Sequence, residues 1–171
     1  CLIGALGESA GGLRLITSGA AIKTDEQKRL IRSHLSPTPL VNEGRILAQS
    51  GLCSASIDIS DGLSSDINHI CAQSGVGARI AEERIPVSKD LLAVFSGSTT
   101  ELTEFIFNGG EDYALLLDVK PGGLQKLQHS LALIGSRLCV IGEFTAQNQV
   151  LTVKANGEVR TLDPEGWDHF R

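Results

Sequence analysis

The chain has 171 residues, of which 42% are hydrophobic and 20% are charged, a balance typical of globular proteins and unlike that of disordered ones. Its 20 acidic and 15 basic residues give a net charge of -5, so no basic surface for the phosphates of DNA or RNA is expected. No apolar run approaches the roughly 20 residues that a membrane-spanning helix needs. We therefore expect no nucleic-acid partner and no membrane span. The length predicts one domain, covering residues 1–171.

The cysteines bear on the redox compartment of the protein, and the first residue bears on whether the chain is part of a longer protein. Cys1, Cys53, Cys71 and Cys139 lie far apart and form no C-x-x-C pair of a zinc or redox site. Free thiols in a reducing cytoplasm are therefore expected. Because the sequence contains no methionine, we expect position 1 to be a cut inside a longer protein.

The first part of the chain predicts a short strand and three helices. Residues 1–16 combine an apolar strand, a glycine-containing turn and a brief helix. Apolar residues at helical spacing predict a helix from Asp25 to Leu35, which the prolines of Ser36–Pro39 end. Another helix is expected over Leu40–Ser50, with Gly51 at its end.

The remainder alternates between strands and helices. The segment around Ile57 predicts a buried strand, followed by a helix from Gly62 to about Ser74. A continuous apolar run at Tyr113–Val119 is typical of a strand, and Gly122–Leu133 has helical spacing. RLCVIGEF predicts another strand, and the last two strands are joined by a hairpin turn at Asn156-Gly157.

The segment DISDGLSSD places Asp58, Ser60 and Asp61 where a strand ends and a helix begins. Two carboxylates three residues apart across such a turn can face one space, and carboxylate oxygens suit Mg²⁺, which completes its shell with phosphate oxygens and water. The free N–H groups at the start of the helix favour phosphate as well. The segment is therefore a candidate metal–phosphate site.

A simpler explanation of the same segment is that Ser60 or Asp61 only caps the helix. Asp58 does not fit that explanation, because a carboxylate at the end of a buried strand would be costly to desolvate without a metal, a cation or several donors. Asp66 is on the flank of the apolar stripe of the helix and could simply face solvent.

A second candidate segment is FNGGEDY, in which Asn108, Gly109 and Gly110 precede Glu111 and Asp112. Residues that tolerate positive φ allow such a loop to approach a ligand closely. The two acids could accept hydrogen bonds from a substrate or bind a metal through water. An ordinary turn with solvated acids explains the pattern equally well.

Histidines offer no further candidate. His34, His69, His129 and His169 are not paired with a serine or cysteine nucleophile of the kind that a hydrolase needs. We expect them to be lone surface residues, and we assign no catalytic residue beyond the metal ligands.

Three segments, at Ile57–Ile70, Asn108–Leu117 and Gly166–Phe170, resemble in order and spacing the signature segments of thiamine-monophosphate kinases. The resemblance begins at ALGES (Ala5–Ser9), includes the PTP turn (Pro37–Pro39) and so covers essentially the whole chain. It implies the α/β (α+β) fold of the C-terminal domain of aminoimidazole ribonucleotide (AIR) synthetase-related proteins, a mixed β-sheet with helices packed on it.

The resemblance also implies roles for single residues. Asp58 and Asp61 match magnesium-binding aspartates, and Ser60 matches a contact to ATP. Glu111 matches an acid that contacts thiamine phosphate, and Trp167 matches an aromatic residue that contacts the rings of the substrate. A tryptophan face can stack on a cationic heteroaromatic ring, although Trp167 could also simply anchor the C-terminus to the core.

The implied activity is the ATP- and Mg²⁺-dependent phosphorylation of thiamine monophosphate to thiamine diphosphate, in thiamine biosynthesis, by a cytoplasmic homodimer. The acceptor is already an anionic phosphate monoester, so positioning and charge neutralisation should matter more than a strong base. The N-terminal half of the family, which supplies dimer contacts and further metal ligands, is absent from this chain, so we expect the fragment alone to be inactive. Leu40 also departs from the family, which often has a basic residue there.

Two alternatives remain open. One is a related ATP-dependent synthetase of the same superfamily, against which the GGEDY and GWDHF segments argue. The other is a non-catalytic module, either a nucleotide-binding fragment or one that only supports a partner chain.

Overall fold

The computed structural model describes residues 1–19 and 21–166, in which the strands form two four-stranded sheets. The first sheet has the order β2-β4-β1-β5 and is antiparallel throughout. Its strands are β1 (Leu2–Ile3), β2 (Cys53–Asp58), β4 (Leu115–Val119) and β5 (Leu138–Cys139). The second has the order β6-β3-β7-β8, in which only β3 and β7 are parallel. Its strands are β3 (Gly77–Ala81), β6 (Gly142–Thr145), β7 (Val150–Val153) and β8 (Val159–Thr161).

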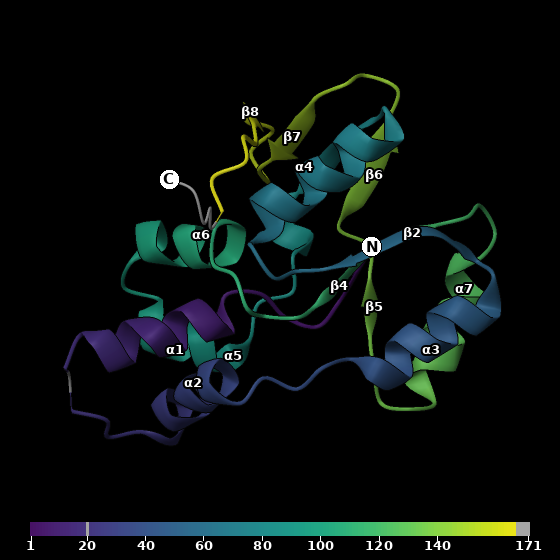
Figure 1. The fold of residues 1–171 in the computed structure, drawn as a ribbon. Helices are drawn as coiled ribbons and strands as arrows, with labels where there is room; N and C mark the ends of the chain where they lie inside the picture. Colours follow the sequence, from purple (N-terminus) through teal and green to yellow (C-terminus); the bar gives the residue numbers. More distant parts are fainter. Residues whose placement is uncertain (20, 167–171) are drawn as a thin grey trace.

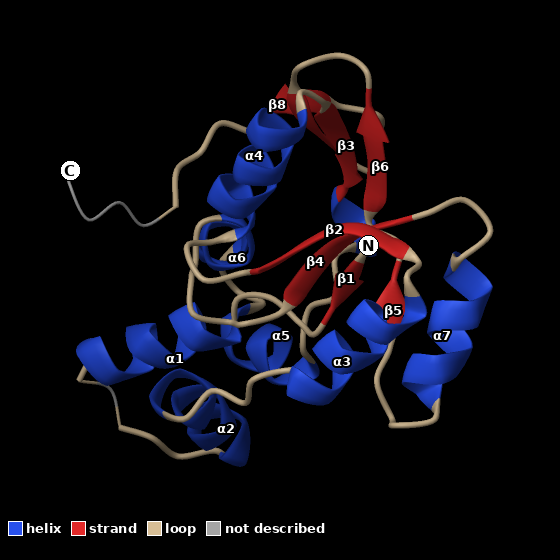
Figure 2. Cartoon of the chain, turned by 45° about the vertical axis from the view of Figure 1, so that its right-hand side comes forward, coloured by secondary structure: helices blue, strands red, loops and turns tan. Residues whose placement is uncertain are grey.

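The helices surround these sheets in three groups. They are α1 (Glu8–Thr17), α2 (Asp25–Leu35), α3 (Val41–Ser50), α4 (Leu63–Ser74), α5 (Lys89–Phe95), α6 (Thr99–Phe107) and α7 (Leu124–Ala132), with a short 3-10 turn at Glu82–Arg84. Helices α3 and α7 lie together at one side of the first sheet, α4 lies along the second sheet, and α1, α2, α5 and α6 form a third group (Figures 1 and 2). No helix in the described part of the chain is long and apolar enough to cross a bilayer.

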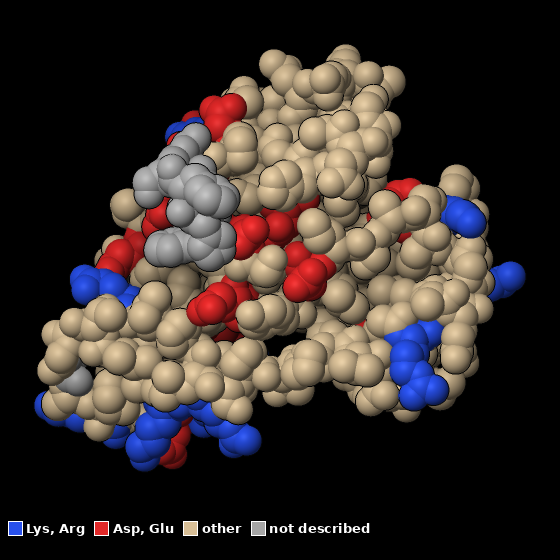
Figure 3. Space-filling view, in the orientation of Figure 1, with Lys and Arg blue, Asp and Glu red and all other residues tan. Residues whose placement is uncertain are grey.

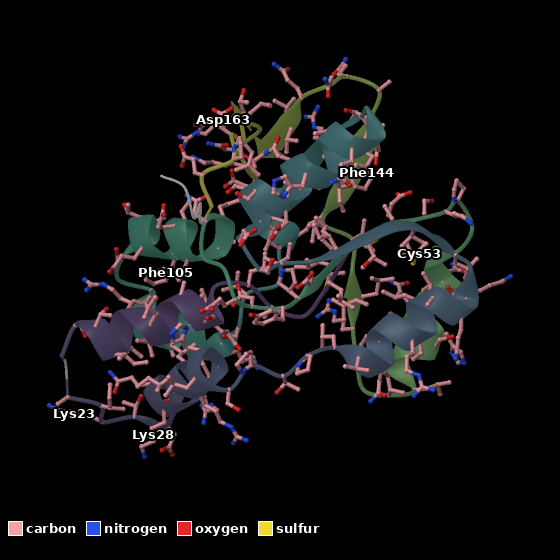
Figure 4. All side chains as sticks on the ribbon, viewed as in Figure 1. Lys23, Lys28, Cys53, Phe105, Phe144 and Asp163 are labelled. Carbon is pink, nitrogen blue, oxygen red and sulfur yellow. The ribbon has the colours of Figure 1, made fainter. Side chains whose placement is uncertain are left out.

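Each helical group has its own apolar cluster, because each amphipathic helix buries one face. The cluster around α4 joins both sheets, and the cluster of α3 and α7 covers the first sheet. In the third group, the rings of Phe95 and Phe105 meet edge to face with centroids 5.0 Å apart, and Figure 4 labels Phe105 on α6. The mixed α/β fold that the resemblance implied is confirmed.

Helices α1 and α2 approach very closely at Gly12. A Cβ atom at this position would lie 2.2 Å from the carbonyl oxygen of Leu30, so any larger residue would force the helices apart. Helix α2 begins with a capping box, in which the Thr24 side chain accepts from the N–H of Gln27 and the Gln27 side chain accepts from the N–H of Thr24. The close approach at Gly12 brings the end of α2 beside the start of α1.

Two expectations about strands were wrong. Strand β2 is half exposed rather than buried, because it lies at the edge of its sheet and pairs only with β4 in the described part of the chain. Ser54, Ser56 and Asp58 are exposed between half-buried neighbours, the period-two pattern of an antiparallel strand with one solvated side. The segment RLCVIGEF is not one strand either, since it divides into β5 and β6, which belong to different sheets. The hairpin at Asn156-Gly157 does join β7 to β8.

Candidate functional site

Two loops from distant parts of the sequence meet at one end of the first sheet. The first loop, Ile59–Gly62, leaves β2, and the second loop, Asn108–Tyr113, leads into β4. Because β2 and β4 are antiparallel neighbours, the last residue of one, Asp58, lies opposite the first residue of the other, Leu115. The two segments that the sequence singled out are therefore neighbours in space.

Backbone hydrogen bonds continue from the strands into both loops. The N–H of Ile59 donates to the carbonyl oxygen of Ala114 at 2.7 Å, and the N–H of Tyr113 donates to that of Ile59 at 2.9 Å. One step further, the N–H of Glu111 donates to the carbonyl oxygen of Ser60 at 2.9 Å. The loops consequently form one bonded unit.

Glycines allow this contact. A Cβ atom on Gly110 would lie 2.3 Å from the carbonyl oxygen of Ser60, and one on Gly62 would lie 3.0 Å from that of Asn108. Gly62 also has a φ of 104°, which residues with a side chain rarely adopt. These glycines were expected to let the loop approach a ligand closely. In the structure they let the backbones of the two loops approach each other.

The second loop contains two non-glycine residues with positive φ, Glu111 at 61° and Tyr113 at 51°. Such conformations are strained and are held by their surroundings. The side chains of Glu111 and Asp112, which are adjacent in the chain, point in different directions. The side chain of Glu111 is 58% exposed, whereas Asp112 is turned towards α1.

Asp112 accepts two hydrogen bonds at the start of α1. Its Oδ2 accepts from the N–H of Gly7 at 2.7 Å, and its Oδ1 accepts from the N–H of Ser9 at 3.0 Å. The carboxylate therefore caps a helix whose own N-cap residue, Gly7, has no side chain. Burial raises the pKa of Asp112 to about 7, against the opposing effect of these two N–H groups.

Asp66 performs the same kind of bonding from α4. It is 1% exposed, so the expectation that it faces solvent was wrong. Its Oδ2 accepts from the N–H of Ser60 at 3.1 Å and from that of Asp61 at 3.2 Å. Burial raises the pKa of Asp66 to about 6. Ser60 and Asp61 thus contribute backbone N–H groups to the buried carboxylate of Asp66.

His34 was expected to be a lone surface residue, and this was wrong. Its Nδ1 lies 2.9 Å from the hydroxyl oxygen of Ser9 and 3.4 Å from Oε2 of Glu111. The side chain of His34 is only 17% exposed, because the close approach of α1 and α2 covers it. No motif in the sequence indicated this contact, since His34 and Glu111 are far apart in the chain.

The end of the described chain reaches the same place. The N–H of Glu165 donates to the hydroxyl of Ser64 at 3.3 Å, and that of Gly166 donates to the hydroxyl of Ser65 at 3.1 Å. Gly166, the first residue of the third signature segment, therefore lies beside the first two segments. Trp167, the predicted contact to the rings of the substrate, lies outside the described residues.

Asp58 is exposed and Asp61 is half-buried, and within residues 1–19 and 21–166 neither forms an ion pair. Because the side chain of Asp58 is exposed, its carboxylate is not desolvated and does not require a metal for that reason. Acidic residues gather in the middle of the face in Figure 3, with Lys and Arg around its rim. Among the described residues no group of three or more His, Cys, Asp or Glu is placed to hold a metal alone. Two carboxylates do fit Mg²⁺ that takes its remaining ligands from phosphate and water.

A cavity of about 470 Å³ lies beside the second loop, lined on one side by α2 and the segment after it and on the other by residues around the start of α1. Its lining includes Asp112, Arg32 and Leu40, but not Asp58 or Glu111, so it adjoins the site without containing the exposed acids. Leu40 is half-buried and also packs against the apolar cluster of α3 and α7.

The chain is similar in sequence and in fold to thiamine-monophosphate kinases. The thiamine-monophosphate kinase of Buchnera aphidicola subsp. Schizaphis graminum is 34% identical over 170 residues, which are 99% of this chain and 51% of that protein. The structure of AaThiL complexed with AMPPCP and TMP has 29% identity and a TM-score of 0.81, covering 99% of this chain and 50% of that one. The thiamine-monophosphate kinase of Stenotrophomonas maltophilia K279a has 28% identity and a TM-score of 0.80, covering 88% and 48%.

The resemblance to thiamine-monophosphate kinases is confirmed by these relatives. The chain spans about half the length of the curated relatives it matches. Residues 2–154 match the family model of AIR synthase related protein, C-terminal domain. Since this match extends over most of its length, the chain belongs to the family of AIR synthase related proteins and corresponds to their C-terminal domain.

Proposed function

We propose that this chain is the ATP- and substrate-binding half of a kinase that transfers phosphate from ATP to thiamine monophosphate, giving thiamine diphosphate. The observation that carries the proposal is that the first two signature segments and Gly166, the first residue of the third, meet at one acidic site. A related structure of similar fold, AaThiL, is complexed with AMPPCP, an ATP analogue, and with TMP.

Asp58 and Asp61 are the proposed magnesium ligands, and Ser60 the proposed contact to ATP. Magnesium held there would neutralise negative charge on the phosphates and allow two anionic groups to approach. Asp58 and Asp61 can serve in this way because both carboxylates are solvent-accessible and form no ion pair with a described residue.

Glu111 and Trp167 are the proposed contacts to thiamine monophosphate. Glu111 is suited to this role because its side chain is exposed on a strained loop, with His34 beside it. The phosphate of the acceptor is anionic already, so these residues need only bind and orient the substrate. No residue of the chain has to form a covalent intermediate.

We further propose that residues 1–171 form a single C-terminal domain, that the complete protein carries an N-terminal half and is a homodimer, and that it is cytoplasmic. The doubled length of the relatives supports the second half. The four free cysteines support a reducing compartment.

Calorimetry on the complete protein tests the proposal. Thiamine monophosphate and Mg²⁺ with AMPPCP should each bind, and ATP should yield thiamine diphosphate. Binding of a purine ribonucleotide in place of thiamine monophosphate would indicate a related synthetase. Absence of any ligand binding would leave a non-catalytic module, and either result would overturn the proposal.

A further inference from the structure

We propose that Asp66 and Asp112 are positioning residues, which shape the two loops of the candidate site without touching its ligands. Each is turned inward and accepts hydrogen bonds from backbone N–H groups, whereas Asp58 and Glu111 are exposed. The consequence for ligand binding rests on the proposed function, but the effect on loop geometry does not.

We call the pair of hydrogen bonds that each of these carboxylates accepts from backbone N–H groups a brace. The first brace joins the first loop, Ile59–Gly62, to α4. A single oxygen of Asp66, Oδ2, accepts from the N–H groups of Ser60 and Asp61. These are the residues proposed to contact ATP and magnesium. Burial of a carboxylate is costly, and the two donors offset that cost only while the loop keeps this conformation. Asp66 therefore fixes the backbone from which Ser60 and Asp61 project.

The second brace joins the second loop to α1. Asp112 uses both oxygens, one for the N–H of Gly7 and one for the N–H of Ser9. Its neighbour Glu111 has a positive φ, a conformation that costs energy unless the surroundings impose it. Anchoring Asp112 to the start of α1 imposes it, and so keeps the side chain of Glu111 facing outward.

The two braces act on one unit, since the N–H of Glu111 donates to the carbonyl oxygen of Ser60. Helix α4 holds this unit from one side and α1 from the other. The acids of the site therefore have two roles. Asp66 and Asp112 hold the loops, and Asp58, Asp61 and Glu111 are available to ligands.

The different bonding of the two braces predicts different responses to the same substitution. Asparagine has one carbonyl oxygen, which can replace Oδ2 of Asp66 and accept both bonds. It cannot replace both oxygens of Asp112, because its NH₂ group would then face a backbone N–H donor. Asp66→Asn should therefore be tolerated where Asp66→Ala is not, and Asp112→Asn should be harmful.

Two measurements on the complete protein decide this. Amide hydrogen exchange, followed by NMR, should stay slow at Ser60 and Asp61 in Asp66→Asn and become at least about tenfold faster in Asp66→Ala. The amides of Gly7 and Ser9 should become faster in Asp112→Asn. Calorimetric affinity for Mg²⁺ with AMPPCP should change less than about threefold in Asp66→Asn and fall at least about tenfold in Asp66→Ala. Asp25→Asn, at an exposed acid of α2, is the matched control.

Loss of nucleotide affinity in Asp66→Asn with protected loop amides would make Asp66 a ligand and overturn the proposal. Unchanged exchange in Asp66→Ala or in Asp112→Asn would overturn it as well. If the unsubstituted protein binds no Mg²⁺ with AMPPCP, the proposed function fails, while the exchange rates still decide whether the two acids hold the loops.

Discussion

Nδ1 of His34 lies 3.4 Å from Oε2 of Glu111, although the two residues come from elements far apart in the chain. The same nitrogen lies 2.9 Å from the buried hydroxyl of Ser9. His34 therefore contacts the buried Ser9 with the same nitrogen that faces the carboxylate of Glu111. This contact restricts the orientation of Glu111.

Replacing His34 by alanine should weaken binding of thiamine monophosphate by the complete kinase. The contact that restricts Glu111 is lost, so KM for this substrate should rise about tenfold while kcat changes less. Steady-state kinetics of His34→Ala measure the effect, with His129→Gln on α7, an exposed histidine, as control. An unaltered KM would show that His34 does not orient Glu111.

Replacing Asp58 by asparagine should abolish most turnover and leave the fold intact. The side chain is exposed and forms no ion pair with a described residue, so its loss should cost little stability. Removing a proposed metal ligand should lower kcat/KM on the order of 100-fold or more. Kinetics and thermal unfolding of Asp58→Asn test this, with Glu83→Gln as control, because Glu83 is also exposed and forms no ion pair with a described residue. Normal turnover in Asp58→Asn would remove Asp58 from the metal site.

Alanine at Gly110 should destabilise the protein and separate the two loops. Its Cβ would lie 2.3 Å from the carbonyl oxygen of Ser60, and backbone must move to relieve the clash. We expect a loss of about 1–3 kcal/mol in the free energy of unfolding, measured by urea denaturation. Gly97→Ala is the matched control, because nothing lies within 4 Å of the added Cβ there. Equal stability of the two variants would contradict the close contact of the loops.

The stability of the folded chain should fall as the pH rises from about 4 to about 7, through Asp112. Burial raises the pKa of Asp112 in the folded chain to about 7, from an ordinary value of 3.8. Over this interval the unfolded chain has already lost the proton that the folded chain still binds, so rising pH favours unfolding. Below this interval both states are protonated, and above it both are ionised, so the dependence disappears.

One proton contributes a slope of at most about 1.4 kcal/mol per pH unit. Asp66, whose pKa burial raises to about 6, adds to the fall in stability up to that pH. Urea denaturation between pH 4.5 and pH 8 should therefore show a smaller slope in Asp112→Asn than in the unsubstituted chain, whatever the absolute stability of the variant. Identical slopes in the two proteins would mean that Asp112 is not protonated in the folded state at these pH values.

Much of the local structure could be predicted from the sequence. The helix at Asp25–Leu35 has the predicted bounds, the helix after Gly62 begins one residue later and ends at Ser74, and the hairpin turn lies at Asn156-Gly157. These features depend on apolar spacing, helix ends and turn residues, which are local properties of the chain. The segments that carry the family resemblance were local as well.

The sequence alone determined which segments carry the resemblance to the family and which residue types they offer. Only the tertiary structure decided that Asp66 and Asp112 turn inward while Asp58 and Glu111 face solvent, and that β2 is an edge strand. The partners of Asp112 lie 103 and 105 residues away in the chain, and β2 pairs with a strand from a distant segment, so neither outcome could be predicted from neighbouring residues. Asp66 bonds to residues only five and six positions away, but its burial depends on what packs against α4.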